Sequence, residues 1–172
     1  MAKKKFYPII GIEVHLQVKT RNKIFCNCKN NFGDKPNTNI CPICTGQPGV
    51  LPVLNREVVK RGLKMAAALN CKVNLYTRFD RKNYFYPDCP KDYQITQFDY
   101  PIGYKGKFFY FTQDGQKNIE IERVHMEEDS AKLIHKDDSL SKGSIIDYNR
   151  SGVPLLEIVT APDFRDFDSP ID

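Results

Sequence analysis

The stretch Ile10-Gly-Ile-Glu-Val-His-Leu-Gln-Val18 alternates strictly, with an apolar side chain at every second position. Because successive side chains of an extended chain point to opposite faces, the pattern predicts a strand with one face on the core. Glu13, His15 and Gln17 then share the opposite, polar face. The stretch therefore indicates a half-buried strand at the start of a sheet.

Shorter runs of the same kind predict further strands. They cover residues 71–76, 93–98, 108–112, 118–122, 144–148 and 155–160. Asp114-Gly115, between the third and fourth of these runs, is a hairpin signal. Asn55 is suited to cap a helix of about fourteen residues that ends near Asn70. Because strands outnumber helices and the hairpins are local, we expect an α+β fold with a largely antiparallel sheet and one helix packed on it.

The composition is that of a soluble globular protein. The 172 residues, 41% of them hydrophobic, suffice for one domain with its own core. The net charge of +5 includes the leader Lys3-Lys4-Lys5 and does not by itself indicate a nucleic-acid partner. No stretch approaches the roughly 20 apolar residues of a membrane span, so no membrane association is expected. Residues 166–172 resemble the first turn of a further helix, which predicts that the chain is part of a longer protein.

Four cysteines are spaced as Cys26-x-Cys28 and Cys41-x-x-Cys44. Two short pairs on either side of a loop are typical of a tetrahedral Zn²⁺ site, and the glycines and prolines of 46–52 favour a tight knuckle after them. Unligated or disulfide-paired thiols are the alternative. The N-terminus lacks the pattern of a signal peptide, which favours a reducing cytoplasmic setting and hence a metal.

Carboxylates and a histidine form a second set of candidates. Glu13 and His15 lie two apart on the first strand, so they share a face and can hold a metal ion or a proton between them. A solvated outer face is the alternative. The triplet Glu127-Glu128-Asp129 ends a hairpin arm, and Glu157 lies inside an apolar run, where a carboxylate needs a cation or a donor. This oxygen-rich set suits Mg²⁺ better than Zn²⁺.

Two polar segments are candidates for nucleotide binding. The aromatic and basic loop 77–91 contains Lys82 and Tyr84, which can hold phosphate and stack on a base, although such loops also simply close a core. Asn149 and Arg150 form a second candidate phosphate contact. The sequence has no Walker A loop, Rossmann fingerprint or Gly-x-Ser-x-Gly elbow. A thiol nucleophile is a further possibility, with Cys71 or Cys89 paired with His125 or His135.

Six ordered blocks of the chain resemble a known family. They are Ile10–Gln17, Cys41–Pro52, Phe79–Asp88, Tyr93–Gln97, His125–Asp129 and Val153–Val159. Together they closely resemble the GatB family, the B subunits of the bacterial and organellar aspartyl/glutamyl-tRNA amidotransferases, over almost the whole chain.

The resemblance implies a ligase that works with partner proteins. In that family the partner GatA hydrolyses glutamine, and GatB uses ATP and Mg²⁺ to phosphorylate the side-chain carboxylate of Glu or Asp mischarged on tRNA(Gln) or tRNA(Asn). Ammonia then displaces the phosphate. The implied partners are the glutaminase GatA, the third component GatC and the mischarged tRNA, in the cytoplasm or an organellar matrix.

The resemblance also implies site residues. Glu13, His15 and Glu128 match the positions that hold the catalytic Mg²⁺, with Glu127, Asp129 and Glu157 as neighbours. Cys26, Cys28, Cys41 and Cys44 match a structural zinc knuckle, in region 25–52, that some members of the family have.

In the family, an antiparallel cradle domain precedes a helical segment and a tail that grips the tRNA. Residues 1–172 match the first part of the cradle, so we expect the chain alone to be inactive. Two other functions remain open at this point: a zinc-ribbon module that binds RNA without catalysis, and the thiol hydrolase above.

Overall fold

The computed structural model describes residues 6–113, 115–138 and 141–165, so the helix start expected at 166–172 lies outside it. The elements follow one another along the chain as β1 (Glu13–Gln17), α1 (Arg56–Ala68), β2 (Lys72–Val73), β3 (Asp80–Asn83), β4 (Tyr93–Thr96), β5 (Gly103–Thr112), β6 (Gly115–Glu128), β7 (Lys132–Asp138), β8 (Ser141–Asp147) and β9 (Pro154–Thr160). In this part of the chain no helix is long and apolar enough to cross a membrane.

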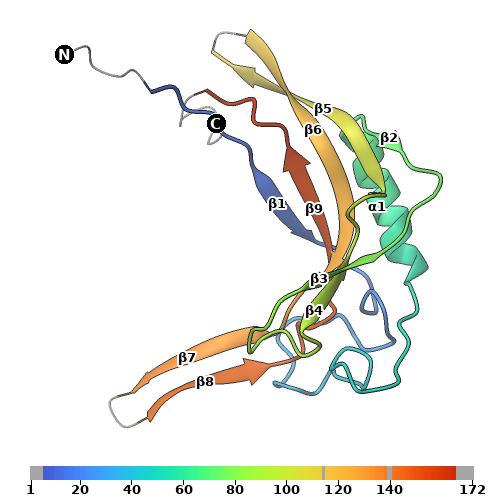
Figure 1. Cartoon of the computed structure of the whole chain (residues 1–172), viewed down its shortest axis with the longest axis vertical. Coiled ribbons are helices and arrows are strands. Elements are labelled where there is room, and N and C mark those ends of the chain that lie inside the picture. Colours follow the sequence, from blue (N-terminus) through green and yellow to red (C-terminus); the bar gives the residue numbers. More distant parts are fainter. Residues whose placement is uncertain (1–5, 114, 139–140, 166–172) are drawn as a thin grey trace.

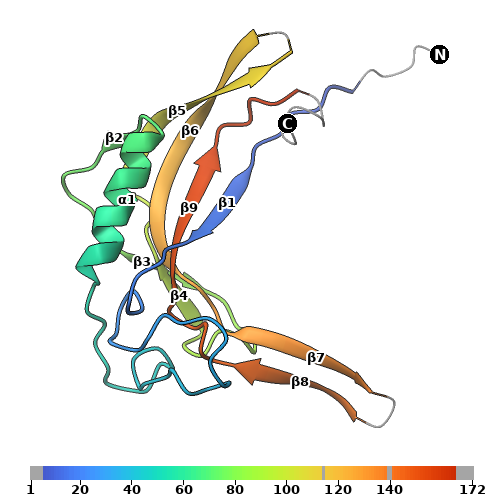
Figure 2. The same ribbon diagram turned by 180° about the vertical axis from the view of Figure 1, so that it is seen from behind.

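The strands form one curved antiparallel sheet and a separate hairpin (Figure 1). The main path of the sheet runs β1-β9-β6-β4-β3, and β5 pairs with both β6 and β2. The β7–β8 hairpin projects away from the sheet, and α1 packs on the opposite side (Figures 1 and 2). The predicted α+β fold, with a largely antiparallel sheet and a helix on it, is confirmed.

Helix α1 begins and ends where its capping residues predict. The side chain of Asn55 accepts a hydrogen bond of 2.9 Å from the Glu57 N–H, and Asn70 ends the helix with a φ of 52°. Gly62 lets the helix approach the sheet, because a Cβ there would lie only 3.0 Å from Ile102 Cδ1 and 3.4 Å from Leu156 Cδ2. The helix therefore covers the apolar face and leaves the polar face to a site.

Two strands were not predicted. Strand β3 forms within the expected loop 77–91, and β7 forms directly after the acidic triplet. Asp80, Arg81, Lys82 and Asn83 of β3 are polar without alternation, which hides a strand from periodicity. Such a composition suits a strand at the end of a sheet, where charged side chains discourage pairing with other chains.

A β-bulge in β6 reverses the alternation of its faces. Against β9, Ile121 pairs with Thr160 and Arg123 with Val159. An interval of two residues on β6 therefore lies opposite an interval of one residue on β9. Ile119 and Ile121 lie in the apolar core before the bulge, and Val124 and Met126 lie there after it. The bulge therefore moves odd-numbered residues from the apolar face to the polar face, which brings Arg123, His125 and Glu127 to the site side.

Strand β5 comes very close to the end of α1 at Gly106. Gly106→Ala is therefore expected to destabilise the fold by about 3 kcal/mol. An added Cβ would lie 2.4 Å from Cys71 Sγ and 2.5 Å from the Leu69 carbonyl oxygen. Gly143→Ala is the control, because its Cβ meets nothing within 4 Å. Urea titration compares them, and equal stability of the two variants would contradict the close packing.

Candidate functional site

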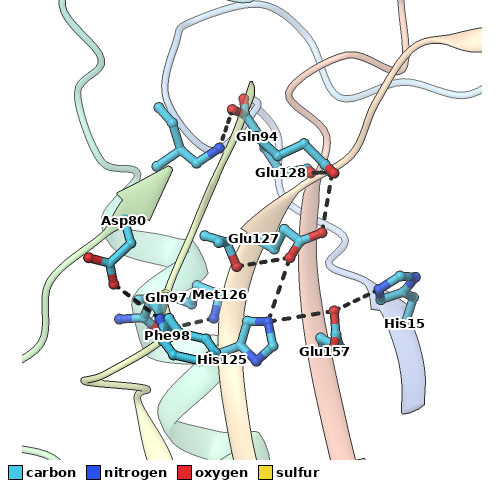
Figure 3. Close-up of polar contacts among 12 residues, drawn as sticks. His15, Asp80, Gln94, Gln97, Phe98, His125, Met126, Glu127, Glu128 and Glu157 are labelled. Carbon is cyan, nitrogen blue, oxygen red and sulfur yellow. Dashed lines mark hydrogen bonds and ion pairs between the residues drawn. The ribbon is translucent and has the colours of Figure 1, made fainter. Parts of the chain in front are cut away.

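Three adjacent strands place a row of ionisable side chains on the polar face. His15 on β1 is opposite Glu157 on β9, and Glu157 is opposite His125 on β6. His15 Nε2 lies 2.9 Å from Glu157 Oε2, and His125 Nε2 lies 3.5 Å from the same oxygen. Figure 3 shows His125 between the carboxylates of Glu157 and Glu127, with His15 reaching Glu157 from β1. Strand register therefore brings together residues far apart in the sequence.

Glu127 completes this cluster from the end of β6. Its carboxylate lies 3.6 Å from His125 Nε2 and accepts hydrogen bonds from Thr96 Oγ1 (2.8 Å) and Gln94 Nε2 (3.2 Å). Burial acts to raise the pKa of Glu127, but the hydrogen bonds from His125 and Thr96 and the charge of Lys82 lower it overall. Glu127 is therefore an anion that its surroundings hold in place.

The cluster suits a metal ion. One ligand atom each from His15, Glu127 and Glu157 lies within 4.8 Å of the others. Both carboxylates are buried, at 2% and 6% exposed, and two anions so close together need a cation between them. His125 Nδ1 is buried and has no hydrogen-bond partner among the described residues. Oxygen ligands predominate in this set, since two of its three groups are carboxylates, and carboxylates suit Mg²⁺.

Glu127 and Glu157 of this cluster line a cleft of about 500 Å³ on the polar face of the sheet, and His15 lies outside its lining. The cleft carries both signs of charge. Its acidic lining residues are Glu13, Asp80, Asp99, Glu127 and Glu157, and its basic ones are Arg81, Lys82 and Arg123. Arg123 Nε is buried without a hydrogen-bond partner in the described part of the chain. The arrangement can hold a metal ion together with an anionic ligand such as phosphate.

Glu128 lies apart from this cluster. Its carboxylate pairs with Lys91 and accepts a hydrogen bond of 2.8 Å from the Ile95 N–H. Burial raises the pKa of Glu128, and Lys91 opposes that rise. Of the three residues expected to hold Mg²⁺, the structure brings His15 to the cluster and Glu13 to the cleft, but it gives Glu128 a cation of its own.

The residues expected to bind a nucleotide lie in different parts of the structure. Lys82 lines the cleft. Tyr84 is half-buried, and burial and a hydrogen bond with Cys89 raise its pKa. Asn149 binds the Asn39 N–H (2.8 Å) and the Lys35 carbonyl (2.7 Å).

Arg150 lies with Asn149 on another surface. It donates to the carbonyls of Ser130 (3.0 Å) and Ala131 (2.7 Å), and its Nε is 3.5 Å from an oxygen of Asp129. Burial raises the pKa of Asp129, which Arg150 and Gln17 oppose. The structure thus places Asn149, Arg150 and Asp129 in loop packing rather than beside Lys82.

Several residues of the cleft were not predicted from the sequence. Arg81, Arg123 and Thr96 were not candidates, and His125 was considered only as a partner for a thiol. The signal for His125 is its place two residues before Glu127, since both then share a face of one strand. If the alternation of Ile119 and Ile121 continued without the bulge, however, His125 and Glu127 would lie on the core face of the strand.

The four spaced cysteines form a compact cluster, with one Sγ each of Cys26, Cys28, Cys41 and Cys44 within 4.8 Å of the others. None is in a disulfide. A hydrogen bond with Cys26 and the charge of Lys23 lower the pKa of Cys44 to about 4. The bond with Cys44 and burial raise the pKa of Cys26, and burial raises that of Cys28 to about 11. Four close sulfurs are compatible with a structural Zn²⁺.

The two remaining cysteines lack the character of nucleophiles. Burial raises the pKa of both Cys71 and Cys89. A reactive cysteine instead needs a lowered pKa, which a nearby cation or an ion pair with histidine provides. His125 lies among carboxylates, and His135 bonds Ser144 on the β7–β8 hairpin. The geometry therefore does not favour a thiol hydrolase.

Comparisons with known proteins show the family of the chain. Residues 8–170 match the family model described as the GatB/GatE catalytic domain. The chain is similar to proteins named as the B subunit of aspartyl/glutamyl-tRNA(Asn/Gln) amidotransferase in Carboxydothermus hydrogenoformans (54% identity, 94% of this chain) and Moorella thermoacetica (55%, 94%). The protein of that name in Thermotoga maritima is 52% identical over 92% of this chain. The matches cover 34% of each relative, so the chain spans about a third of their length. The chain belongs to the GatB/GatE catalytic domain family.

Proposed function

We propose that this chain carries the ATP- and Mg²⁺-dependent site of a tRNA-dependent amidotransferase, in which a side-chain carboxylate of Glu or Asp on mischarged tRNA is activated and amidated. The observation that carries the proposal is one cleft lined by three cationic side chains and by Glu127 and Glu157, which form a cluster with His15. Family membership alone suggests the class of reaction, whereas the residues of this cleft support the binding of a metal ion and of phosphate groups.

His15, Glu127 and Glu157 would hold the Mg²⁺. When bound, the ion would offset the repulsion between a carboxylate and the phosphates that must meet it. Glu127 is oriented by Thr96 and Gln94, and Glu157 by the two histidines. Side chains fixed in this way bind a cation without first reorganising, which favours the reaction.

The cations would receive the phosphates. Arg123 and Lys82 line the cleft, and a guanidinium with a free Nε–H can bind two phosphate oxygens at once. The substrate carboxylate oxygen attacks the γ-phosphorus and ADP leaves. Ammonia then forms the C–N bond, the C–O bond to phosphate breaks, and phosphate leaves.

The partners follow from the same proposal. The relatives are named as one subunit of an amidotransferase, and we propose that this chain likewise works with a glutaminase of the GatA kind, with GatC and with mischarged tRNA. Residues 1–172 would form part of a cradle domain, with 25–52 as a structural zinc knuckle. Membership of a catalytic family argues against a zinc-ribbon module that binds RNA without catalysis.

The test is amidation by the full-length protein that contains this sequence, assembled with its partner proteins. Glutamine-dependent conversion of glutamyl-tRNA(Gln) or aspartyl-tRNA(Asn) should require both ATP and Mg²⁺ and release one ADP per product. Amidation without ATP, or RNA binding with no turnover, would refute the proposal.

Arg123→Gln is expected to raise the KM for ATP of that complex about 10–100-fold, because one charge-assisted contact to phosphate is worth about 1.5–3 kcal/mol. Arg56→Gln is the matched control. Arg56 is exposed at the start of α1, and it does not line the cleft. An unchanged KM in Arg123→Gln, or an equal rise in both variants, would contradict this role.

A further inference from the structure

A buried lysine lies against the cysteine cluster. Lys23 is 0% exposed, and its ammonium donates to the carbonyls of Asn39 (2.8 Å) and Tyr148 (3.4 Å) and to Cys44 Sγ (3.5 Å). Lysine is almost never fully buried unless it is paired. The two carbonyls satisfy its hydrogen bonds but carry no net negative charge, so the ammonium needs an anion nearby.

The neighbouring carboxylate is already paired. Glu128 lies beyond Gly152, where a Cβ would be 3.5 Å from Lys23 Cδ and 3.9 Å from Glu128 Oε2. That carboxylate has its own buried cation in Lys91, since both side chains are less than 10% exposed, at 7% and 3%. The cysteine sulfurs are therefore the groups left to balance Lys23.

We propose that Lys23 is the counter-cation of the cysteine site, offsetting part of the negative charge that four thiolates bring to one Zn²⁺. The inference rests on zinc binding by this site, but the role of Lys23 goes beyond it. Four thiolates around Zn²⁺ leave a net charge of −2, and one ammonium in contact with them halves it. Uncompensated charge in a buried place is unfavourable, so the lysine should strengthen metal binding.

Lys23 also contacts both halves of the site. Its backbone N–H donates to the Cys28 carbonyl at 3.0 Å, while its side chain reaches Cys44 in the second pair. Through Tyr148 it further contacts the turn that leads into β9. One residue thus supplies charge at the point where both cysteine pairs and that turn meet.

The experiment measures Zn²⁺ affinity of the 172-residue chain by competition with a chelator of known affinity. Lys23→Met keeps most of the length of the side chain without its charge and should weaken Zn²⁺ binding about 10–100-fold, as loss of groups around metal ligands does. Lys29→Met, at an exposed lysine next to Cys28, removes the same charge from the surface and should change affinity less than threefold. Lys23→Gln keeps a donor for the Asn39 carbonyl and should lose Zn²⁺ affinity as Lys23→Met does. It is the variant to measure if Lys23→Met does not fold.

A second readout separates charge from simple packing. Lys23→Met should lower the free energy of unfolding more in the zinc-loaded protein than in the metal-free protein. Equal losses in the two forms would mean that the lysine only anchors loops and would overturn the inference. Unchanged Zn²⁺ affinity in both Lys23 variants would overturn it while leaving the zinc site intact, whereas a wild-type chain that binds no Zn²⁺ would overturn both.

Discussion

Glu157→Gln is expected to lower ATP-dependent amidation by the complete amidotransferase about 10²–10³-fold. The side chain is 8% exposed and lies between His15 and His125. Glutamine keeps its shape but removes the charge that would hold the cation. The measurement is the rate of amidated product with saturating glutamine, as a function of Mg²⁺ concentration. The half-saturating Mg²⁺ concentration should rise, and near-normal amidation at ordinary Mg²⁺ would refute this assignment of the site.

Glu128→Gln is the matched comparison and should behave differently. Removing its charge leaves Lys91 buried without its partner, which costs about 3–5 kcal/mol of stability. The variant should therefore melt at a lower temperature, while its remaining activity keeps the wild-type dependence on Mg²⁺. A large shift in Mg²⁺ dependence without loss of stability would instead place Glu128 among the ligands.

Glu127 and Glu128 show which part of the site was hard to predict from the sequence. Neighbouring residues on a strand point to opposite faces, so only one of Glu127 and Glu128 can face the cluster. Which one does so depends on the bulge between Ile121 and Arg123, which the sequence marks only by a shift of the apolar positions from odd to even numbers. The family resemblance favoured Glu128, while the register favours Glu127 beside His125.

Local signals predicted most of the remaining elements, but not β3 and β7. The alternation around His15, the Asn55 cap and the cysteine spacing each depend on residues close in sequence, and the structure contains the expected strand, helix and cysteine cluster. Strand order and the charged partners of buried groups depend on residues far apart. Lys23 carries no signal in the sequence, because its burial follows from contacts with Asn39 and Tyr148.

Loss of the cysteine site should affect the whole core, because the site joins two parts of it. Ile24 and Phe25, just before the site, are buried in the core. The Asn55 N–H just after it donates to the Ile24 carbonyl at 2.8 Å, and its side-chain amide donates to the Lys23 carbonyl at 3.2 Å. The loop between them thus fixes the position at which α1 begins.

Cys41→Ser is therefore expected to lose Zn²⁺ and several kcal/mol of stability, since binding to a structural site contributes directly to folding. At about 2–4 °C per kcal/mol for a chain of this size, Tm should fall by roughly 10 °C or more. Cys71→Ser is the control, because Cys71 lies against Gly106 at the end of α1 and outside the cluster. Metal analysis should find about one Zn²⁺ per chain in the wild type and in Cys71→Ser, and none in Cys41→Ser. If the wild type is metal-free and as stable as Cys41→Ser, hydrogen bonds alone close the loop, and the four sulfurs are not a zinc site.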